Sequence, residues 1–221
     1  MEITYFGLSC FRFKQGDFSI LTDPFDPKTA GISLSKQKVD AVLWTHSDQR
    51  KTKEVRGRFS RSEARSALGL DVIEIYEPGE YEVGGVFVRT YSNPAFHILT
   101  IDDVNICYLG MMKDQITDEG FAVTGSIDYL IIPVGDAGVF SEWKQVSAMI
   151  KGVDPGVVIP SCYKLPGLAG EFGHLKDISE FLREIEVSSE EKVKRIKKIK
   201  LTSVVDDGDK QYEIVILEKR D

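Results

Sequence analysis

Short runs of apolar and β-branched residues recur along the chain, and their length and composition predict β-strands. Most of these runs are bounded by Gly, Pro, Asp or Asn, which favour turns. Two of them, 129–134 and 157–160, are apolar without alternation, as in strands buried on both faces between helical layers. The predicted strands are 19–22, 39–45, 72–75, 86–88, 96–101, 105–109, 129–134, 157–160 and 212–217. The pattern therefore indicates a layered α/β fold.

Two segments show the spacing of amphipathic helices. Residues 141–151 place Trp143, Val146 and Met149 on one face, which we expect to pack on a sheet. A second helix is predicted after Asp177, where Asp177 and Glu180 have the spacing of a capping box. Weaker helical patterns cover 117–125 and 60–70. No internal repeat or low-complexity linker divides the chain, so one domain spanning residues 1–221 is expected.

Composition and charge narrow the class of protein. The chain has 221 residues, of which 42% are hydrophobic, enough for a substantial core. Its net charge of −7 argues against nucleic acid as a partner of the surface as a whole. Three widely spaced cysteines form neither a disulfide framework nor a zinc ribbon, and no signal peptide or membrane span is visible. These features predict a cytoplasmic protein in a reducing compartment.

One segment departs from the acidic character of the chain. Between residues 192 and 200, six basic residues alternate with isolated apolar ones. Two interpretations remain open: an anion-binding surface for nucleic acid or a membrane, or a solvated face beside the terminal strand. Charge runs commonly do no more than solvate a face, which favours the second interpretation. The possible anion-binding residues are Lys192, Lys194, Arg195, Lys197, Lys198 and Lys200.

Seven separated segments, in order, resemble one family of hydrolases. They include Gly7-Leu8-Ser9, Leu21-Thr22-Asp23-Pro24, Trp44-Thr45-His46-Ser47 and Pro160-Ser161-Cys162-Tyr163. In full, the segments are 3–11, 20–25, 40–47, 78–86, 106–110, 131–135 and 158–167. The chain resembles the metallo-β-lactamase-fold hydrolases, in their short bacterial branch related to ascorbate-phosphate lactonases. The resemblance implies a four-layer αββα sandwich with the site where the loops of two sheets meet.

The resemblance also implies where metal ions would be held, and most of those ligands are replaced. The family's HxHxDH motif keeps its first histidine as His46, and its other ligands fall on Asp48, Arg50 and Lys51. The bridging aspartate falls on Met111 and the last histidine on Cys162. Cations and a thioether cannot replace ligands of a dinuclear zinc centre. The vestigial pocket positions are Asp23, His46, Asp48, Arg50, Lys51, Met111 and Cys162.

Three functions of this pocket remain open from the sequence. The favoured one is a non-catalytic protein without a cofactor, which binds an unidentified small ligand or protein partner. In the second, His46, Asp48 and Cys162, with or without Asp23, hold one zinc or manganese ion that hydrolyses a phosphoester or lactone. In the third, Cys162 is a nucleophile activated by His46 or by nearby cations. The remaining histidine, His174, is expected in a surface loop.

Overall fold

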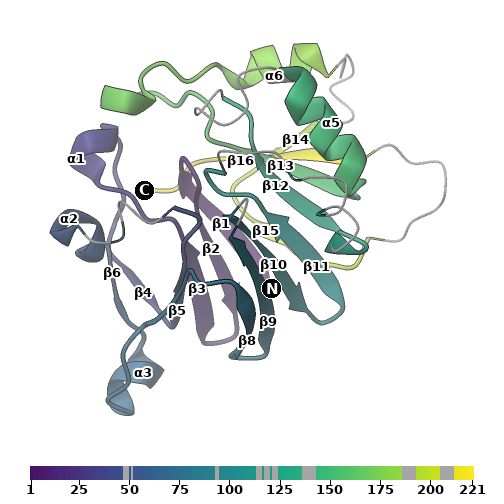
Figure 1. Ribbon diagram of the computed structural model, residues 1–221. Coiled ribbons are helices and arrows are strands. Elements are labelled where there is room, and N and C mark those ends of the chain that lie inside the picture. The colour runs from purple at the N-terminus through teal and green to yellow at the C-terminus, as the bar shows by residue number, and fades with distance from the viewer. Residues whose placement is uncertain are drawn as a thin grey trace.

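Two mixed β-sheets lie face to face in the computed structural model, and helices lie outside them (Figure 1). The structure describes residues 1–46, 50, 52–92, 95–112, 116, 120, 124–135, 143–185, 193–204 and 212–221. This is an α/β fold with two mixed sheets between outer helices, the layered arrangement expected from the sequence. The expected fold class is therefore confirmed.

The first sheet has six strands in the order β15-β1-β2-β3-β5-β7. Strands β1, β2 and β3 form an antiparallel meander, whereas β3, β5 and β7 run parallel to one another. The strands are β1 (Glu2–Gly7), β2 (Cys10–Gln15), β3 (Phe18–Thr22), β5 (Ala41–Leu43), β7 (Ile73–Ile75) and β15 (Ile199–Lys200). A separate pair, β4 (Gln37–Val39) and β6 (Phe59–Arg61), lies beside it.

The second sheet has eight strands in the order β14-β16-β13-β12-β11-β10-β9-β8. Strands β11, β12, β13 and β16 run parallel, which places their carboxyl ends at one edge. The strands are β8 (Gly79–Val83), β9 (Val86–Ser92), β10 (Ala95–Ile101), β11 (Val104–Tyr108), β12 (Tyr129–Pro133), β13 (Val157–Ser161), β14 (Val193–Ile196) and β16 (Glu213–Leu217).

Helices lie on the outer sides of the two sheets. The long helix α5 and the shorter α6 lie beside the second sheet, whereas α1 and α2 lie beside the first sheet (Figure 1). The helices are α1 (Pro27–Ala30), α2 (Lys53–Arg56), α3 (Glu63–Ala67), α5 (Trp143–Val153), the 3₁₀ turn η2 (Gly170–Phe172) and α6 (Ile178–Glu184). None of the helices in the described ranges is long and apolar enough to cross a membrane.

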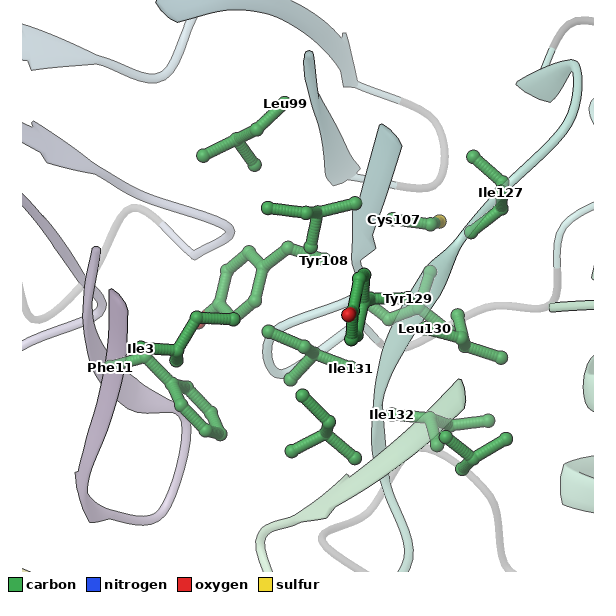
Figure 2. Packing of buried hydrophobic residues seen from close by; sticks show 14 of the residues in the cluster. Ile3, Phe11, Leu99, Cys107, Tyr108, Ile127, Tyr129, Leu130, Ile131 and Ile132 are labelled. Atoms are coloured by element: carbon green, nitrogen blue, oxygen red, sulfur yellow. The ribbon is translucent and has the colours of Figure 1, made fainter. Parts of the chain in front are cut away.

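The main core fills the space between the two sheets. Inward-facing residues of the first sheet, such as Ile3 and Phe11, are almost fully buried against Tyr108 and Ile131 of the second. Figure 2 shows these side chains meeting between the strands. A second apolar cluster, which contains Phe6, lies outside the first sheet and packs under α1 and α2. Both faces of the first sheet are thus buried where α1 and α2 cover it.

Several predicted elements differ in detail from those observed. The run 39–45 is divided between β4 and β5, because the Asp40 carboxylate accepts a hydrogen bond from Ser19 N and another from Ser62 Oγ at the break. The 192–200 segment contains two strands, β14 and β15. The capping box at Asp177 is confirmed. Most of the helix expected over 117–125 lies outside the described residues.

Candidate functional site

The candidate site lies where the carboxyl ends of strands from both sheets come together. Asp23 directly follows β3, and Thr45 and His46 follow β5 in the first sheet. Gly110 and Met111 come shortly after β11, and Cys162 directly follows β13 in the second. Ligands of α/β proteins commonly bind at such strand ends. The structure therefore brings several of the sequence-predicted positions into one neighbourhood.

Asp23 is the buried centre of this neighbourhood, with 1% of its surface exposed. Its Oδ1 accepts a hydrogen bond from the backbone N–H of Thr45 at 2.8 Å. Its Oδ2 accepts one from Thr45 Oγ1 at 2.6 Å and lies 2.6 Å from the hydroxyl of Tyr108. The cost of burying the carboxylate is offset by these donors. Asp23 therefore fixes the strand ends in place.

Thr45 and Tyr108 connect Asp23 to the rest of the site. Thr45 Oγ1 accepts a hydrogen bond from Met111 N at 3.1 Å, and the Tyr108 hydroxyl also lies 2.6 Å from the carbonyl oxygen of Ser9. Burial, followed by the charge of Asp23, raises the pKa of Tyr108 well above its ordinary value. Tyr108 is therefore a neutral hydrogen-bond donor here. It was not among the sequence-predicted site residues, because strand β11 reads as ordinary core.

His46 is the histidine that faces this carboxylate. Its Nδ1 lies 3.5 Å from Asp23 Oδ1, and 17% of its side chain is exposed. Neither ring nitrogen makes a hydrogen bond of normal geometry, although both atoms are shielded from solvent. A carboxylate beside one ring nitrogen orients the imidazole and favours the tautomer that leaves Nε2 free to accept. His46 is thus placed to contact a bound group through Nε2.

His97 lies behind the site and was predicted only as a strand residue. It is 1% exposed, its Nδ1 lies 3.0 Å from Thr90 Oγ1, and its Nε2 lies 3.2 Å from the carbonyl oxygen of Trp44. Burial lowers the pKa of His97 to about 4, despite the opposing influence of Asp23. The neutral ring therefore supports the strand end that carries Thr45 and His46. Both ring nitrogens are engaged, so His97 is not free to hold a ligand.

Cys162 is fully buried, and its backbone N–H donates to the carbonyl oxygen of Leu8 at 2.9 Å. Burial raises the pKa of Cys162 to about 12, a larger effect than the lowering by the Ser161 and Ser9 hydroxyls. The group is therefore a thiol at neutral pH and not a thiolate. The hydroxyls of Ser9 and Ser161 are buried and have no hydrogen-bond partner of normal geometry. These properties argue against the nucleophilic role considered from the sequence.

Several residues of the site have an unusual backbone conformation with positive φ. Leu8, Asp23, Gly110 and Cys162 all have positive φ, with values of 52°, 34°, 56° and 51°. Residues other than glycine pay an energetic penalty of about 1 kcal/mol or more in this region. Clusters of such residues are typical of functional sites, where the surrounding structure holds them. The strain therefore supports this neighbourhood as the functional region.

The other sequence-predicted positions contribute less to the pocket. The Arg50 guanidinium lies over the ring of Tyr76, 3.4 Å from its centroid. Met111 is half-buried, and the interaction that the structure gives it at the site is through its backbone. Asp48 and Lys51 lie outside the described residues. The structure thus brings Asp23 and His46 together and leaves the roles of these four positions as predictions.

The described residues do not fit a dinuclear metal centre. In the part of the chain that the structure describes, no three His, Cys, Asp or Glu side chains form a group that could hold a metal ion. Asp23 is occupied by Thr45 and Tyr108, and Cys162 is protonated. A metal ion needs deprotonated ligands with free lone pairs. Of these three residues, His46 is the one whose ring nitrogens make no hydrogen bond of normal geometry to the described residues.

A cavity of about 450 Å³ lies between α1, α2 and η2. Phe25, Val55 and Phe172 provide apolar lining, and Asp26, Glu54, Glu171 and Lys28 are the charged lining residues. Asp26 is already engaged as the N-cap of α1. The size suits a small ligand, and the net charge of the lining disfavours an anionic one.

The basic segment is divided between the two sheets. Lys194 on β14 forms an ion pair with Glu213 at 2.5 Å, and Lys198 pairs with Glu2 at 2.8 Å. The segment passes from the edge of the second sheet to the edge of the first between β14 and β15. Arg195, Lys197 and Lys200 are exposed, and Lys192 lies outside the described residues. The five described basic residues of the segment are therefore divided between the edges of two sheets.

Comparison with known proteins identifies the family of the chain and several solved structures with a similar fold. Residues 2–161 match the sequence family described as the beta-lactamase superfamily domain. The fold is similar to that of a proposed zinc-dependent hydrolase of the metallo-beta-lactamase superfamily from Thermotoga maritima, with TM-score 0.71, 23% identity and 98% of each chain covered. A proposed metal-dependent hydrolase from Parabacteroides distasonis is similar with TM-score 0.60 and 15% identity, covering 99% of this chain and 93% of the other. A metallo hydrolase from Ignicoccus hospitalis gives TM-score 0.56 and 19% identity, with 85% and 91% covered. No curated protein matches the chain.

Proposed function

Because this chain belongs to the beta-lactamase superfamily, we propose that its function resides in the pocket around His46 and that it binds a ligand there without a dinuclear metal centre. The ligand is a small molecule or a segment of a partner protein. The occupation of Asp23 by protein donors carries this proposal. A carboxylate has about four lone-pair sites, of which the donors of Thr45 and Tyr108 take up to three, and His46 Nδ1 lies 3.5 Å from Oδ1. A metal ion at Asp23 would therefore compete with these protein groups.

The free energy of its hydrogen bonds favours keeping Asp23 bound to Thr45 and Tyr108. Each hydrogen bond to a charged carboxylate contributes about 1.5–3 kcal/mol, and a buried donor left without an acceptor costs about 1–3 kcal/mol. A metal ion at Asp23 would compete with Thr45 and Tyr108, whose side chains are buried. The protonated thiol of Cys162 does not offset that cost, since it offers no anionic ligand at neutral pH.

His46 supplies the polar contact to a ligand. With Nδ1 toward Asp23, its Nε2 is able to accept a hydrogen bond from a hydroxyl, amide or ammonium group. His46 is not among the described residues that line the cavity between α1, α2 and η2, so that cavity is a separate candidate site for a small ligand.

A second candidate function is metal-dependent hydrolysis of a phosphoester or lactone at a site with one metal ion. Two observations favour it: the structural neighbours are described as metal-dependent hydrolases, and the His46–Asp23 pair has the arrangement of a metal-ligating histidine with its supporting carboxylate. Judged by the comparisons alone, this candidate has the better support. His46 would hold the ion together with ligands from outside the described residues, such as Asp48, and the ion would supply an activated water.

Metal analysis of the purified protein separates the two candidates. The chain is prepared without chelator and analysed by mass spectrometry of the elements, beside His46→Ala and the loop control His174→Ala. The first candidate expects only trace zinc, manganese and iron in all three proteins. A nearly stoichiometric metal that is lost in His46→Ala and kept in His174→Ala would overturn it and support the hydrolase.

A ligand screen tests binding directly. Thermal unfolding is measured against a panel of small polar molecules, for which a ligand at one hundred times its Kd stabilises the fold by about 2.7 kcal/mol. In a chain of this size, each kcal/mol raises Tm by about 2–4 °C. Hits that disappear in His46→Ala and persist in His174→Ala support binding at the pocket. Hits that persist in both variants would place the ligand elsewhere.

A further inference from the structure

We propose that the outer face of the first sheet, across β15, β1 and β2, binds the phosphate backbone of double-stranded nucleic acid without reading its sequence. This surface, called the basic face below, is formed by Arg12, Lys14, Lys198, Lys200 and Arg220. It is separate from the pocket around His46, so the test of this proposal does not depend on the function proposed for that pocket.

The strand register places these side chains on one face. Lys200 pairs with Glu2, and Glu2 pairs with Lys14, so the three residues form a row across β15, β1 and β2. The neighbouring row, which contains Ile3 and Phe13, points into the core between the sheets. Because side chains alternate along a strand, the row with the lysines points outward. Both lysines of this row are exposed.

The charge of the row is strongly positive. Glu2 lies between Lys200 and Lys14 and also forms the 2.8 Å ion pair with Lys198, whose side chain is 63% exposed. One carboxylate therefore faces three lysines. An exposed ion pair contributes little stability, so these lysines remain available to an anion. In this row one carboxylate faces several lysines. Lys194, by contrast, has its own carboxylate partner, Glu213, which neutralises its charge.

Arg12 and Arg220 extend the same surface. Arg12 pairs with Thr4 in the register, its guanidinium lies 5.8 Å from the centroid of the Phe6 ring, and its Nη1 donates to Gln37 at 2.9 Å. Burial, followed by repulsion from Arg220, lowers the pKa of Arg12. Its Nε has no hydrogen-bond partner. This Nε is buried, and an anion beside the exposed Arg220 would relieve the repulsion between the two arginines.

The composition of the face favours a nucleic-acid backbone over a membrane. The large exposed apolar residues among the described ones are Leu68, Leu70, Tyr76 and Phe87, none of which belongs to the basic face, so nothing there inserts into lipid. The face also has no exposed aromatic ring on which a base could stack, which disfavours single strands. Lys200 and Lys14 are about 10 Å apart, which is two strand spacings. A duplex carries one phosphate charge per about 1.7 Å of its axis, so both lysines can contact phosphates of one duplex.

The net charge of −7 does not prevent this contact. At an ionic strength of about 0.1 M the Debye length is about 10 Å, so carboxylates on the far side of the molecule are screened from a ligand on this face. The sequence-based argument against nucleic acid applies to the surface as a whole. It does not apply to the basic face, where five cations surround Glu2, even with the exposed Glu218 and Asp221 beside Arg220 along the chain.

The salt dependence of binding tests the proposal. Fluorescence anisotropy is measured with two labelled 20-bp DNA duplexes of unrelated sequence, between about 50 and 200 mM KCl. With four exposed cations in contact, the slope of log K against log[salt] is expected to be about −4, with equal affinity for both duplexes. Neutralising two of them in Lys14→Gln/Lys200→Gln is expected to bring the slope to about −2. The control Lys151→Gln/Lys164→Gln removes two exposed lysines elsewhere and should leave the slope unchanged.

The outcomes are separable. Circular dichroism and thermal melting confirm that both double variants are folded, as expected for exposed lysines. Binding that weakens equally in both double variants would overturn the proposal, since it would reflect overall charge. Absence of DNA binding also overturns it, and in that case lysine-dependent sedimentation with phosphatidylserine vesicles would assign the face to a membrane surface.

Discussion

Removing the hydroxyl of Tyr108 tests how strongly its hydrogen bond to Asp23 stabilises the site. Tyr108→Phe keeps the buried ring and deletes one donor that lies 2.6 Å from Asp23 Oδ2 and from Ser9 O. Ser9 O still accepts from Thr22 Oγ1 at 2.9 Å, so the lost interaction is mainly the one with the carboxylate. A hydrogen bond to a charged group contributes about 1.5–3 kcal/mol. With about 2–4 °C per kcal/mol, Tm should fall by about 3–12 °C.

The matched control is Tyr163→Phe. Tyr163 is also buried, and its hydroxyl donates to a neutral carbonyl, that of Leu217, at 3.2 Å. Such a bond contributes about 0.5–1.5 kcal/mol. The free energy of unfolding is measured for both variants by urea denaturation with the same m-value. If Tyr108→Phe loses no more stability than Tyr163→Phe, the Tyr108–Asp23 contact is not the strong interaction inferred here, and the argument against metal binding at Asp23 fails with it.

Three further predictions concern the same region. The pKa of His97 is about 4 in the fold and 6.5 in the unfolded chain. Its contribution to the free energy of unfolding is therefore complete above pH 6.5, and about 3 kcal/mol is lost as the pH falls toward 4. Urea denaturation at several pH values should show this loss, and His97→Gln should remove it. Cys162, buried and with a pKa of about 12, should resist iodoacetamide at pH 8 in the native protein and react fully in guanidinium, as mass spectrometry would show; rapid native labelling contradicts the burial. Gly110→Ala should destabilise the fold by at least about 2 kcal/mol more than Gly69→Ala. Both glycines have positive φ, but only at Gly110 would the new Cβ lie 2.2 Å from Thr45 Oγ1. Equal melting temperatures of the two variants would refute this packing.

The layered fold was predictable from the sequence because it depends on local patterns. The unbroken apolar run at 129–134 becomes β12 between the two layers, and the Asp177 capping box starts α6. The division of 39–45 into two strands was not predictable. It depends on Asp40 accepting hydrogen bonds from Ser19 and Ser62, each more than twenty residues away. The register that assembles the basic face likewise joins β15 to β1 across nearly the whole chain.

The site was only partly predictable, and the reason is also distance along the chain. The resemblance to metallo-β-lactamase-fold hydrolases identified Asp23, His46 and Cys162 as pocket positions. It could not show that Asp23 is occupied by Tyr108, 85 residues away, or that the Cys162 thiol is protonated by burial. His97 looks like any strand residue in the sequence. Its function in supporting Trp44 depends on one contact with Thr90 on the neighbouring strand β9 and one with Trp44, which follows β5 in the other sheet.

The pairing of β1 has a consequence for how the protein folds during synthesis. One side of β1 pairs at once with β2, but its other side is completed by β15 and by the bridge from Tyr5 to Lys219. Until the ribosome has made these residues, the side of β1 that faces β15 presents unpaired N–H and C=O groups, which can pair with strands of other proteins. A nascent chain stalled before residue 199 should therefore depend on chaperones, and this dependence should end once β15 has paired with β1.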